Sequence, residues 1–281
     1  MNYRHAFHAG NFADVHKHSV LASILVHLRR KAAAFRIVDT HAGAGCYDLF
    51  GPEASRSGEW HDGIEPLWRA CRDKTAQTWL APYLEAVEAL NPDGKLRTYP
   101  GSPLIAAHLL RSQDRLVACE AEPEAAAALA QVLRGDTRAK ALKIDGWMAL
   151  AAYVPPKERR GLVIIDPPFE DAADFDRLSG ALAGAYGKWP TGIYMLWYPI
   201  KERAAPDALA RRLKKLAIPN MLRSELTLRA PRPQAPLAGS GLILVNPPFR
   251  ADGDLRTVEP ALGEALSRET TARTDWLVPP R

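Results

Sequence analysis

Cysteine is scarce in this chain of 281 residues, which has only three: Cys46, Cys71 and Cys119. Their number is odd, they lie far apart, and no two have the C-x-x-C spacing of redox and zinc motifs. The sequence therefore predicts neither a disulfide framework nor a zinc site. This cysteine usage is typical of a protein of the reducing cytoplasm.

Long apolar runs are also missing. No uninterrupted stretch approaches the roughly 20 apolar residues that a membrane-spanning helix needs. The first eight residues include Tyr3, Arg4, His5 and His8 and contain no apolar core of a secretion signal. We therefore expect a cytoplasmic protein with no membrane partner.

Charge is only slightly unbalanced, since 37 Lys and Arg stand against 32 Asp and Glu, a net charge of +5. This excess permits a polyanionic partner without requiring one. The length and the 47% hydrophobic content suit one large domain. Residues 51–97 begin with Gly, Pro, Ser and Arg and continue in helical stretches. We therefore expect a single domain over residues 1–281 with a small helical insertion at 51–97.

The N-terminal segment is basic and rich in histidine. Apolar residues with i, i+3, i+4, i+7 spacing predict an amphipathic helix over residues 12–30, with Asn11 as its cap. Four histidines form two close pairs: His5 with His8, and His16 with His18. Positions two apart on a helix point to different faces, and no carboxylate or cysteine cluster completes a ligand set. We therefore expect no metal, and histidines that face solvent or substrate.

Short apolar strands alternate with helical stretches along most of the chain. Strands are predicted at residues 35–39, 96–99, 116–119, 141–144, 162–165, 193–197, 225–229 and 242–245. Such alternation predicts an α/β fold with a mostly parallel, doubly wound sheet and helices on both faces. Ligands bind these sheets at the carboxyl ends of the strands.

Polar residues stand at several of these strand ends. The first strand leads into Gly43-Ala44-Gly45, a loop that lets a ligand approach the backbone, and Asp48 replaces the third glycine of a dinucleotide motif. Glu120 can bridge two ribose hydroxyls, Asp145 can accept from an adenine amine, and the glycine loop can meet an amino-acid tail. This set fits S-adenosylmethionine better than a dinucleotide. Each acid alone could equally be a helix cap or a solvated loop carboxylate.

The strand at residues 162–165 ends in Asp166-Pro167-Pro168-Phe169. An exocyclic base amine is a poor nucleophile, and a carboxylate with a backbone carbonyl can orient its lone pair towards an electrophile. Asp166 and the Pro167 carbonyl suit this task, because proline stiffens the turn. Phe169 can stack on a base that is flipped out of its helix. The plain alternative is a strand followed by a proline turn.

A second copy of the motif, Asn246-Pro247-Pro248-Phe249, follows a late strand. Asparagine can also accept from a base amine, so residue type does not exclude it. Order along the chain favours Asp166, because its strand takes the place at which a doubly wound sheet has its crevice.

Several longer segments resemble the RlmJ family of bacterial 23S ribosomal RNA adenine-N6 methyltransferases, and the resemblance runs nearly end to end. They are residues 3–5, 7–11, 13–15, 17–18, 39–45, 99–104, 145–146, 166–168, 196–199 and 246–248. The N-terminal and His-Ala-Gly-Ala-Gly segments are long and unusual, and they are more specific than Asp-Pro-Pro-Phe. Phe169 stands where relatives often have Tyr, a change that retains stacking and removes a hydroxyl.

The resemblance implies a Rossmann-like class I methyltransferase fold that uses S-adenosylmethionine, forms S-adenosylhomocysteine and needs no metal. The residues that it places on the cofactor or its product are His18, His41, Ser102, Glu120, Asp145, Gly146 and Asp166. It also implies that Asp166 accepts from the target amine and that Tyr3 meets the RNA. We expect Lys17, in the same basic segment as Tyr3, to be a second RNA contact.

The resulting prediction is N6-methylation of one adenine in 23S ribosomal RNA, before the subunit is fully assembled, by a monomer. A DNA adenine-N6 methyltransferase would use the same Asp-Pro-Pro-Phe motif and is the nearest alternative. A nucleic-acid-binding protein that kept the crevice and lost turnover is an alternative from another class, and the intact motif argues against it.

Overall fold

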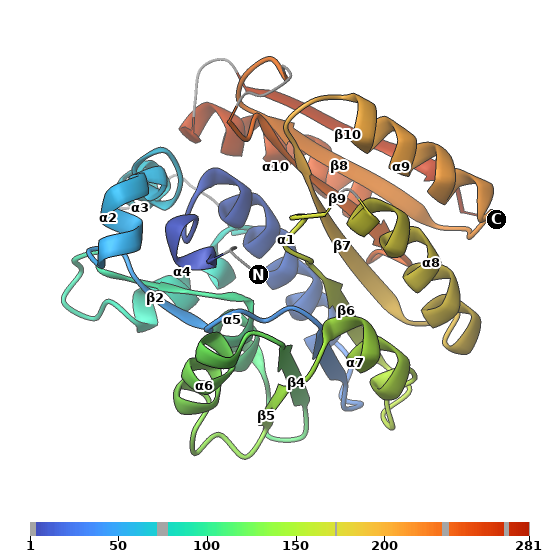
Figure 1. Cartoon of the computed structure of the whole chain (residues 1–281), viewed down its shortest axis with the longest axis horizontal. Coiled ribbons are helices and arrows are strands. Elements are labelled where there is room, and N and C mark those ends of the chain that lie inside the picture. Colours follow the sequence, from blue (N-terminus) through green and yellow to red (C-terminus); the bar gives the residue numbers. More distant parts are fainter. Residues whose placement is uncertain (1–3, 72–77, 172, 232–235, 267–269, 281) are drawn as a thin grey trace.

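A computed structural model describes residues 4–71, 78–171, 173–231, 236–266 and 270–280 (Figure 1). Its main sheet has the strand order β10-β8-β9-β7-β6-β1-β4-β5. The strands are β1 Arg36–Asp39, β4 Arg115–Glu120, β5 Ala139–Lys143, β6 Gly161–Ile165, β7 Ile193–Ile200, β8 Met221–Thr227, β9 Gly239–Val245 and β10 Thr271–Val278.

Strands β5, β4, β1, β6 and β7 pair in parallel. From β1 the chain builds outward through β4 and β5, and it then returns to place β6 on the other side of β1. The topological switch point therefore lies between β1 and β6, where ligands of such sheets bind. Strand β9 is antiparallel to both β7 and β8, and β10 is antiparallel to β8. The predicted doubly wound and mostly parallel sheet is confirmed.

Helices cover both faces of the sheet. One face packs against α1 Phe12–Arg29, α5 Ser102–Leu109, α6 Pro123–Val132 and α10 Ala251–Leu266, and the other packs against α7 Gly146–Tyr153, α8 Ala173–Lys188 and α9 Ala204–Lys215. In β6, Ile164 faces the first layer while Val163 and Ile165 face the second. A strand buried on both sides has an unbroken apolar sequence, which is why β6 could be recognised. Figure 1 shows α8 and α9 in front of the sheet and α10 behind it.

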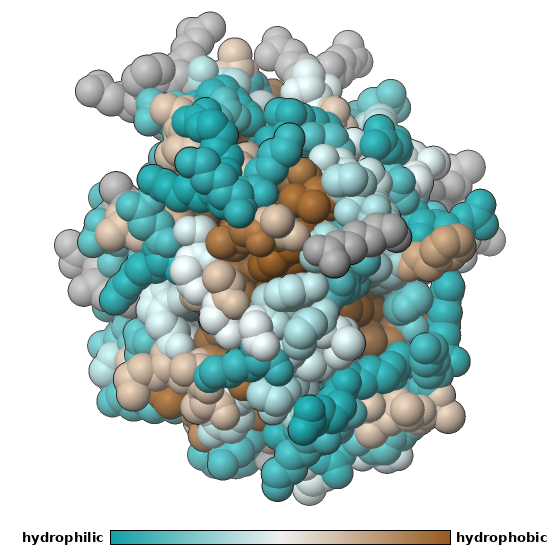
Figure 2. All heavy atoms as spheres, turned by 90° about the vertical axis from the view of Figure 1, so that its right-hand side faces the viewer, coloured by the Kyte–Doolittle hydropathy of each residue, from teal (hydrophilic) through white to brown (hydrophobic). Residues whose placement is uncertain are grey.

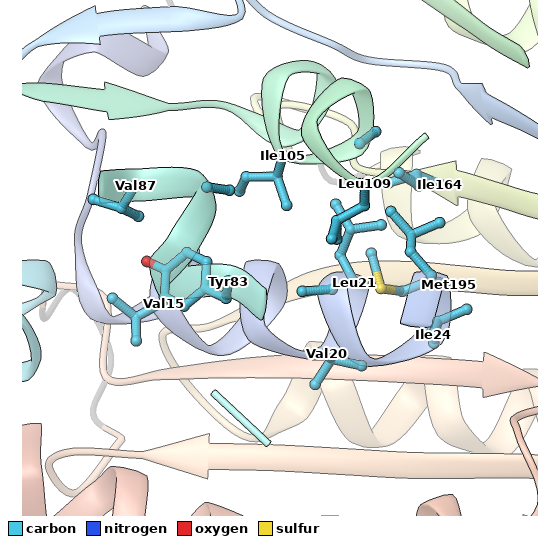
Figure 3. Close-up of a cluster of buried hydrophobic side chains, with 14 of the residues drawn as sticks. Val15, Val20, Leu21, Ile24, Tyr83, Val87, Ile105, Leu109, Ile164 and Met195 are labelled. Atoms are coloured by element: carbon cyan, nitrogen blue, oxygen red, sulfur yellow. The ribbon is translucent and has the colours of Figure 1, made fainter. Parts of the chain in front are cut away.

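Helix α1 is the most deeply enclosed helix of the first layer, with 14 of its 18 residues buried. Figure 3 shows Leu21 of α1 close to Leu109 of α5 and to Met195 of β7. The predicted cap is confirmed, because the Asn11 side chain accepts from the Asp14 backbone N–H at 2.9 Å. Asp14, His16, Lys17 and His18 are all buried in this helix, so each must have polar partners.

Residues 51–97 are largely helical where the structure describes them. The elements are α2 Pro52–Ser57, η2 Glu59–Asp62, α3 Ile64–Cys71 and α4 Ala81–Ala89, and η1 His5–Phe7 packs against α2. Helix α4 packs on α1 and α5, and α3 packs on α10. The strand predicted at 96–99 is β3 Thr98–Pro100, and it pairs with β2 Cys46–Asp48 in a separate two-stranded sheet. The strands on either side of the helical segment, β2 and β3, lie next to each other. They pair with each other and not with the main sheet.

The last part of the chain differs most from expectation. Strand β8 begins at Met221, earlier than predicted, and α10 and β10 were not predicted at all. Pro260 lies inside α10, and an interior proline argues against a helix when only the sequence is read. Its apolar face nevertheless packs on β8 and β10 and is part of the core.

The outer surface is mainly polar. On the face that lies to the right in Figure 1, hydrophilic residues cover most of the surface and hydrophobic ones show in recesses between them (Figure 2). None of the helices in the described ranges is long and apolar enough to cross a membrane.

Leu21→Ala should lower the free energy of unfolding by about 2–5 kcal/mol, because Leu21 is fully buried between α1 and the sheet. Leu104→Ala, at a half-buried position of α5, is the matched control and should cost about 1 kcal/mol. Urea unfolding followed by circular dichroism measures both. Equal losses would contradict the enclosed position of α1.

Candidate active site

A cavity of about 430 Å³ opens at the carboxyl edge of the parallel strands. The sequence-predicted residues that line it are Lys17, His18, His41, Ser102, Glu120, Asp145, Gly146 and Asp166. Pro167 and Phe169 are not among its lining residues, although Pro168 is. Tyr3 lies outside the described residues. The fold thus brings side chains from α1, α5 and the ends of β1, β4, β5 and β6 to one place.

The glycine loop and Glu120 are bonded to each other. The Gly43 backbone N–H donates to Glu120 Oε2 at 2.9 Å, and the Glu122 N–H donates to Oε1 at 2.8 Å. Gly43 and Gly45 have φ of +60° and +80°, a region that favours glycine. A carboxylate has about four acceptor sites, so Glu120 is held in place and can still accept from a ligand.

Asp145 caps α7, because its Oδ1 accepts from the Met148 backbone N–H at 3.0 Å. Asp145 also lines the cavity, so the same side chain caps a helix and faces the site. A Cβ on the next residue, Gly146, would lie 2.3 Å from the Thr40 carbonyl oxygen. Only glycine fits this close approach of α7 to the end of β1.

Ser102 is the first residue of α5 and does not cap it. Gly101 holds the cap position, and the Ser102 hydroxyl donates to Asp39 Oδ2 at 2.7 Å. Asp39 is the last residue of β1 and is fully buried, so its carboxyl needs a hydrogen-bond donor. The Ser102 hydroxyl provides this donor and is not used to cap the helix. Burial raises the pKa of Asp39 to about 7, although the Ser102 hydrogen bond lowers it.

His18 and His41 line the cavity as neutral groups. Burial lowers the pKa of His18 to about 3 and that of His41 to about 4. His18 Nδ1 lies 2.8 Å from the Tyr99 hydroxyl, and His41 Nδ1 lies 2.8 Å from Thr40 Oγ1. Both rings therefore keep one charge state, and one hydrogen-bonding pattern, through the neutral pH range.

Lys17 links two carboxylates at the floor of the site. Its Nζ lies 2.5 Å from Asp166 Oδ2 and 3.0 Å from Asp14 Oδ1. Only 6% of the Lys17 side chain and 16% of the Asp166 side chain are exposed, so this ion pair is poorly screened by water. Lys17, which we predict to be a second RNA contact, has its ammonium paired with these two carboxylates.

Asp14 is a site residue that sequence reasoning missed. Its Oδ2 accepts from the Gly10 N–H at 3.0 Å and lies 3.0 Å from His5 Nε2. Burial raises the pKa of Asp14, but His5, Lys17 and His18 lower it more, and the result lies well below the usual value. The i, i+3 spacing of Asp14 and Lys17 was the available signal.

The expectation of solvated or substrate-facing histidines is wrong for His16, which is fully buried. Its Nε2 lies 2.8 Å from Ser224 Oγ and its Nδ1 lies 3.0 Å from Ser240 Oγ. Both serines come from strands more than 200 residues later in the chain, so no local pattern could identify them.

The two Pro-Pro-Phe motifs lie at opposite edges of the sheet. Asp166 follows β6 at the switch point, whereas Asn246 follows the antiparallel β9 and donates through Nδ2 to the carbonyls of Pro190 and Gly192, both at 2.8 Å. Phe169 packs against Phe175 and Trp197, with ring centroids 4.7 and 5.7 Å apart. Only the Asp166 motif adjoins the cavity.

The cavity lining is strongly acidic. Nine carboxylate residues face three cationic ones, the latter being Arg4, Lys17 and Arg177. Such a lining disfavours a polyphosphate and suits a ligand with positive charge. Among the described residues no group of three or more His, Cys, Asp or Glu could hold a metal ion.

A family model described as ribosomal RNA large subunit methyltransferase D, RlmJ, matches residues 32–278. This chain belongs to the RlmJ family. Two curated proteins named ribosomal RNA large subunit methyltransferase J are similar to it over 99% of both chains: one from Escherichia coli strain K12 at 40% identity and one from Haemophilus influenzae at 38%. The resemblance noted in the sequence is confirmed, and as a member of the RlmJ family the chain is a methyltransferase.

A solved structure has the same fold. A crystal structure of a Legionella pneumophila protein superposes with a TM-score of 0.89 at 31% identity, and the match covers 96% of this chain and 98% of that one. The RlmJ fold described above, from α1 to β10, is therefore shared nearly end to end with that protein.

The free energy of unfolding of Asp39→Asn should rise relative to that of the wild type as the pH increases from 4 to 7. The folded protein holds the Asp39 proton to about pH 7, whereas the unfolded chain releases it near the ordinary value of 3.8. The wild type therefore loses stability over this interval, and the variant has no such loss. Urea unfolding at a series of pH values measures the difference.

The control is Asp136→Asn. The hydrogen bond from Arg138 lowers the pKa of Asp136, so its contribution is present above pH 4 and is lost only at lower pH. The difference between this variant and the wild type should stay constant from pH 5 to 7. A constant difference for Asp39→Asn as well would contradict the raised pKa of Asp39.

Proposed function

We propose that this protein transfers a methyl group from S-adenosylmethionine to N6 of one adenine in 23S ribosomal RNA. The observation that carries the proposal is the position of Asp166. It follows β6 at the switch point and lies in one cavity with Glu120 and Asp145. Membership of the RlmJ family and the names of the two curated relatives support ribosomal RNA as the substrate.

The cavity residues fit the cofactor by charge and by donor type. S-adenosylmethionine carries a sulfonium and an ammonium, and the excess of carboxylates in the lining favours such a ligand. Glu120 would accept from the ribose hydroxyls and Asp145 from the adenine amine. His18, His41 and Ser102 would surround the methionine part of the cofactor. The two histidines are neutral and add no charge there. When bound, the cofactor supplies a methyl group on a sulfonium that is already activated as a leaving group.

Asp166 and the Pro167 carbonyl accept from the two N–H bonds of the target amine and direct its lone pair to the methyl carbon. The amine would then take the methyl group from the sulfonium and leave S-adenosylhomocysteine, and the excess proton on N6 would pass to water. Lys17 holds the Asp166 carboxylate in place, since its ammonium lies 2.5 Å from Oδ2. Phe169 stacks on the flipped base.

The RNA approaches along the N-terminal segment. Tyr3 is proposed as a direct RNA contact, and Lys17 is proposed to meet the target nucleotide at Asp166. Base flipping needs access to the RNA, so the substrate is 23S RNA before full subunit assembly, in the cytoplasm. The chain acts as a monomer with one methyltransferase domain over residues 1–281, and residues 51–97 form an insertion within it.

Asp166→Ala should abolish methyl transfer and leave the fold intact, because it removes the acceptor that orients the amine. Labelled S-adenosylmethionine is supplied with protein-free 23S RNA, assembled large subunits or duplex DNA, and the nucleosides are separated after digestion. The wild type should give N6-methyladenosine from protein-free RNA above all. Asn246→Ala is the matched control at the second motif and should retain activity.

Near-normal turnover by Asp166→Ala would contradict the assignment. Label in duplex DNA at least equal to that in RNA would identify a DNA adenine methyltransferase. Cofactor binding without product on any of the three substrates would identify a binding protein.

Glu120→Gln should raise the dissociation constant for S-adenosylmethionine by roughly ten- to a hundredfold, because a charged acceptor of two hydroxyls is lost. Calorimetric titration of the cofactor into the protein measures this without turnover. Glu88→Gln, at an exposed position of α4 away from the cavity, should bind as the wild type does. Unchanged affinity in Glu120→Gln would remove Glu120 from the cofactor site.

A further inference from the structure

Trp197 is the one residue of β7 that is partly exposed, since the other seven are buried. Its indole lies edge-on to the Phe169 ring, with centroids 5.7 Å apart and an interplanar angle of 68°. The Lys17 ammonium lies 5.7 Å from the centroid of the same indole. Trp197 therefore contacts both the last residue of the Asp-Pro-Pro-Phe motif and the cation that pairs with Asp166.

A chain of buried hydrogen bonds begins at this indole. Trp197 Nε1 donates to Ser240 Oγ at 3.0 Å, and Ser240 Oγ lies 3.0 Å from His16 Nδ1. His16 Nε2 lies 2.8 Å from Ser224 Oγ, and the Ser224 hydroxyl donates to Glu259 Oε1. All four groups beyond the indole are buried, and Thr274 donates to the other Glu259 oxygen at 2.5 Å.

One placement of the protons uses every donor once. The Glu259 carboxylate only accepts, so the Ser224 hydroxyl donates to it and accepts from His16 Nε2–H. With its donor at Nε2, His16 accepts at Nδ1 from the Ser240 hydroxyl, 3.0 Å away. The Ser240 oxygen is then left to accept from the indole N–H. The hydrogen bonds thus run in one direction, from Trp197 on β7 to Glu259 on α10.

We propose that Trp197 is a positioning residue for methyl transfer, held at one angle by this buried chain. The indole fixes the Phe169 ring and the Lys17 ammonium, and through them the target base and Asp166. The inference rests on the function proposed above. It gives a role to four buried polar groups that do not line the cavity and would otherwise only add to the cost of burial.

Two variants test the role from different sides. Trp197→Phe keeps an aromatic ring beside Phe169 and Lys17 but has no N–H, and Ser240→Ala keeps the indole but removes its acceptor. Each should lower kcat for RNA methylation about tenfold, since small misplacements of reacting groups have effects of this order. Dissociation constants for S-adenosylmethionine and RNA should stay within about twofold. Wild-type kcat in both variants would overturn the inference.

The double variant separates positioning from general stability. If Ser240 acts on catalysis through the indole N–H, adding Ser240→Ala to Trp197→Phe lowers kcat no further. The free energy of unfolding should still fall, because His16 Nδ1 loses its donor. Additive losses in kcat would overturn the inference.

Tyr198→Phe is the matched control on the same strand. The Tyr198 hydroxyl is buried on the opposite face of β7 and donates to Glu225 Oε1 at 2.8 Å. Its loss should lower stability about as much as Ser240→Ala does, with kcat unchanged. An equal fall in kcat would assign the effect to weakening of the strand, against the inference.

A measurement without turnover tests the hydrogen bond itself. In protein labelled with ¹⁵N-tryptophan, the indole resonance that disappears in Trp197→Phe should exchange slowly with solvent in the wild type and rapidly in Ser240→Ala. Equal exchange would overturn the inference whatever the activity. Absence of RNA methylation by the wild type would instead overturn the proposed function, and the positioning role with it.

Discussion

The burial of polar side chains on α1 is the constraint on which the rest of the molecule depends. A helix enclosed on nearly all sides cannot leave Asp14, His16, Lys17 or His18 to water, so each must find a partner in the surrounding layers. Lys17 forms an ion pair with Asp166 at the switch point, and His18 is hydrogen-bonded to Tyr99 beside the helical segment. His16 finds serines on the antiparallel strands. One helix thereby sets the relative positions of three parts of the chain.

The direction of β9 explains why two nearly identical tetrapeptides differ in their surroundings. Because β9 runs against β7, its carboxyl end lies at the amino edge of the parallel strands. Asn246 there bonds to two carbonyls of the turn before β7 and is a structural residue of that turn. The same residue types therefore serve a ligand cavity at one edge of the sheet and a chain reversal at the other.

The parts that could be predicted are those whose signal is local. Apolar runs ending in Glu120 and Asp166 gave β4 and β6, because these strands are buried on both faces. The hydrogen bond from Ser102 to Asp39 was missed, since the two residues are 63 positions apart. Asp14 and the partners of His16 were missed for the same reason, and Pro260 concealed α10. Hydrogen bonds between distant elements depend on tertiary structure, which the hydrophobic periodicity of the sequence does not reveal.

The hydrogen bonds of His16 have a consequence for the order of events during synthesis. Its partners Ser224 and Ser240 follow it by 208 and 224 residues, and Lys17 precedes Asp166 by 149. Helix α1 therefore cannot complete its contacts until β8 and β9 have been made. Pairings of such long sequence separation form slowly, because the loops between them must close first. The chain must remain incompletely folded while most of it is translated, and its native state is reached as a whole after β9 emerges.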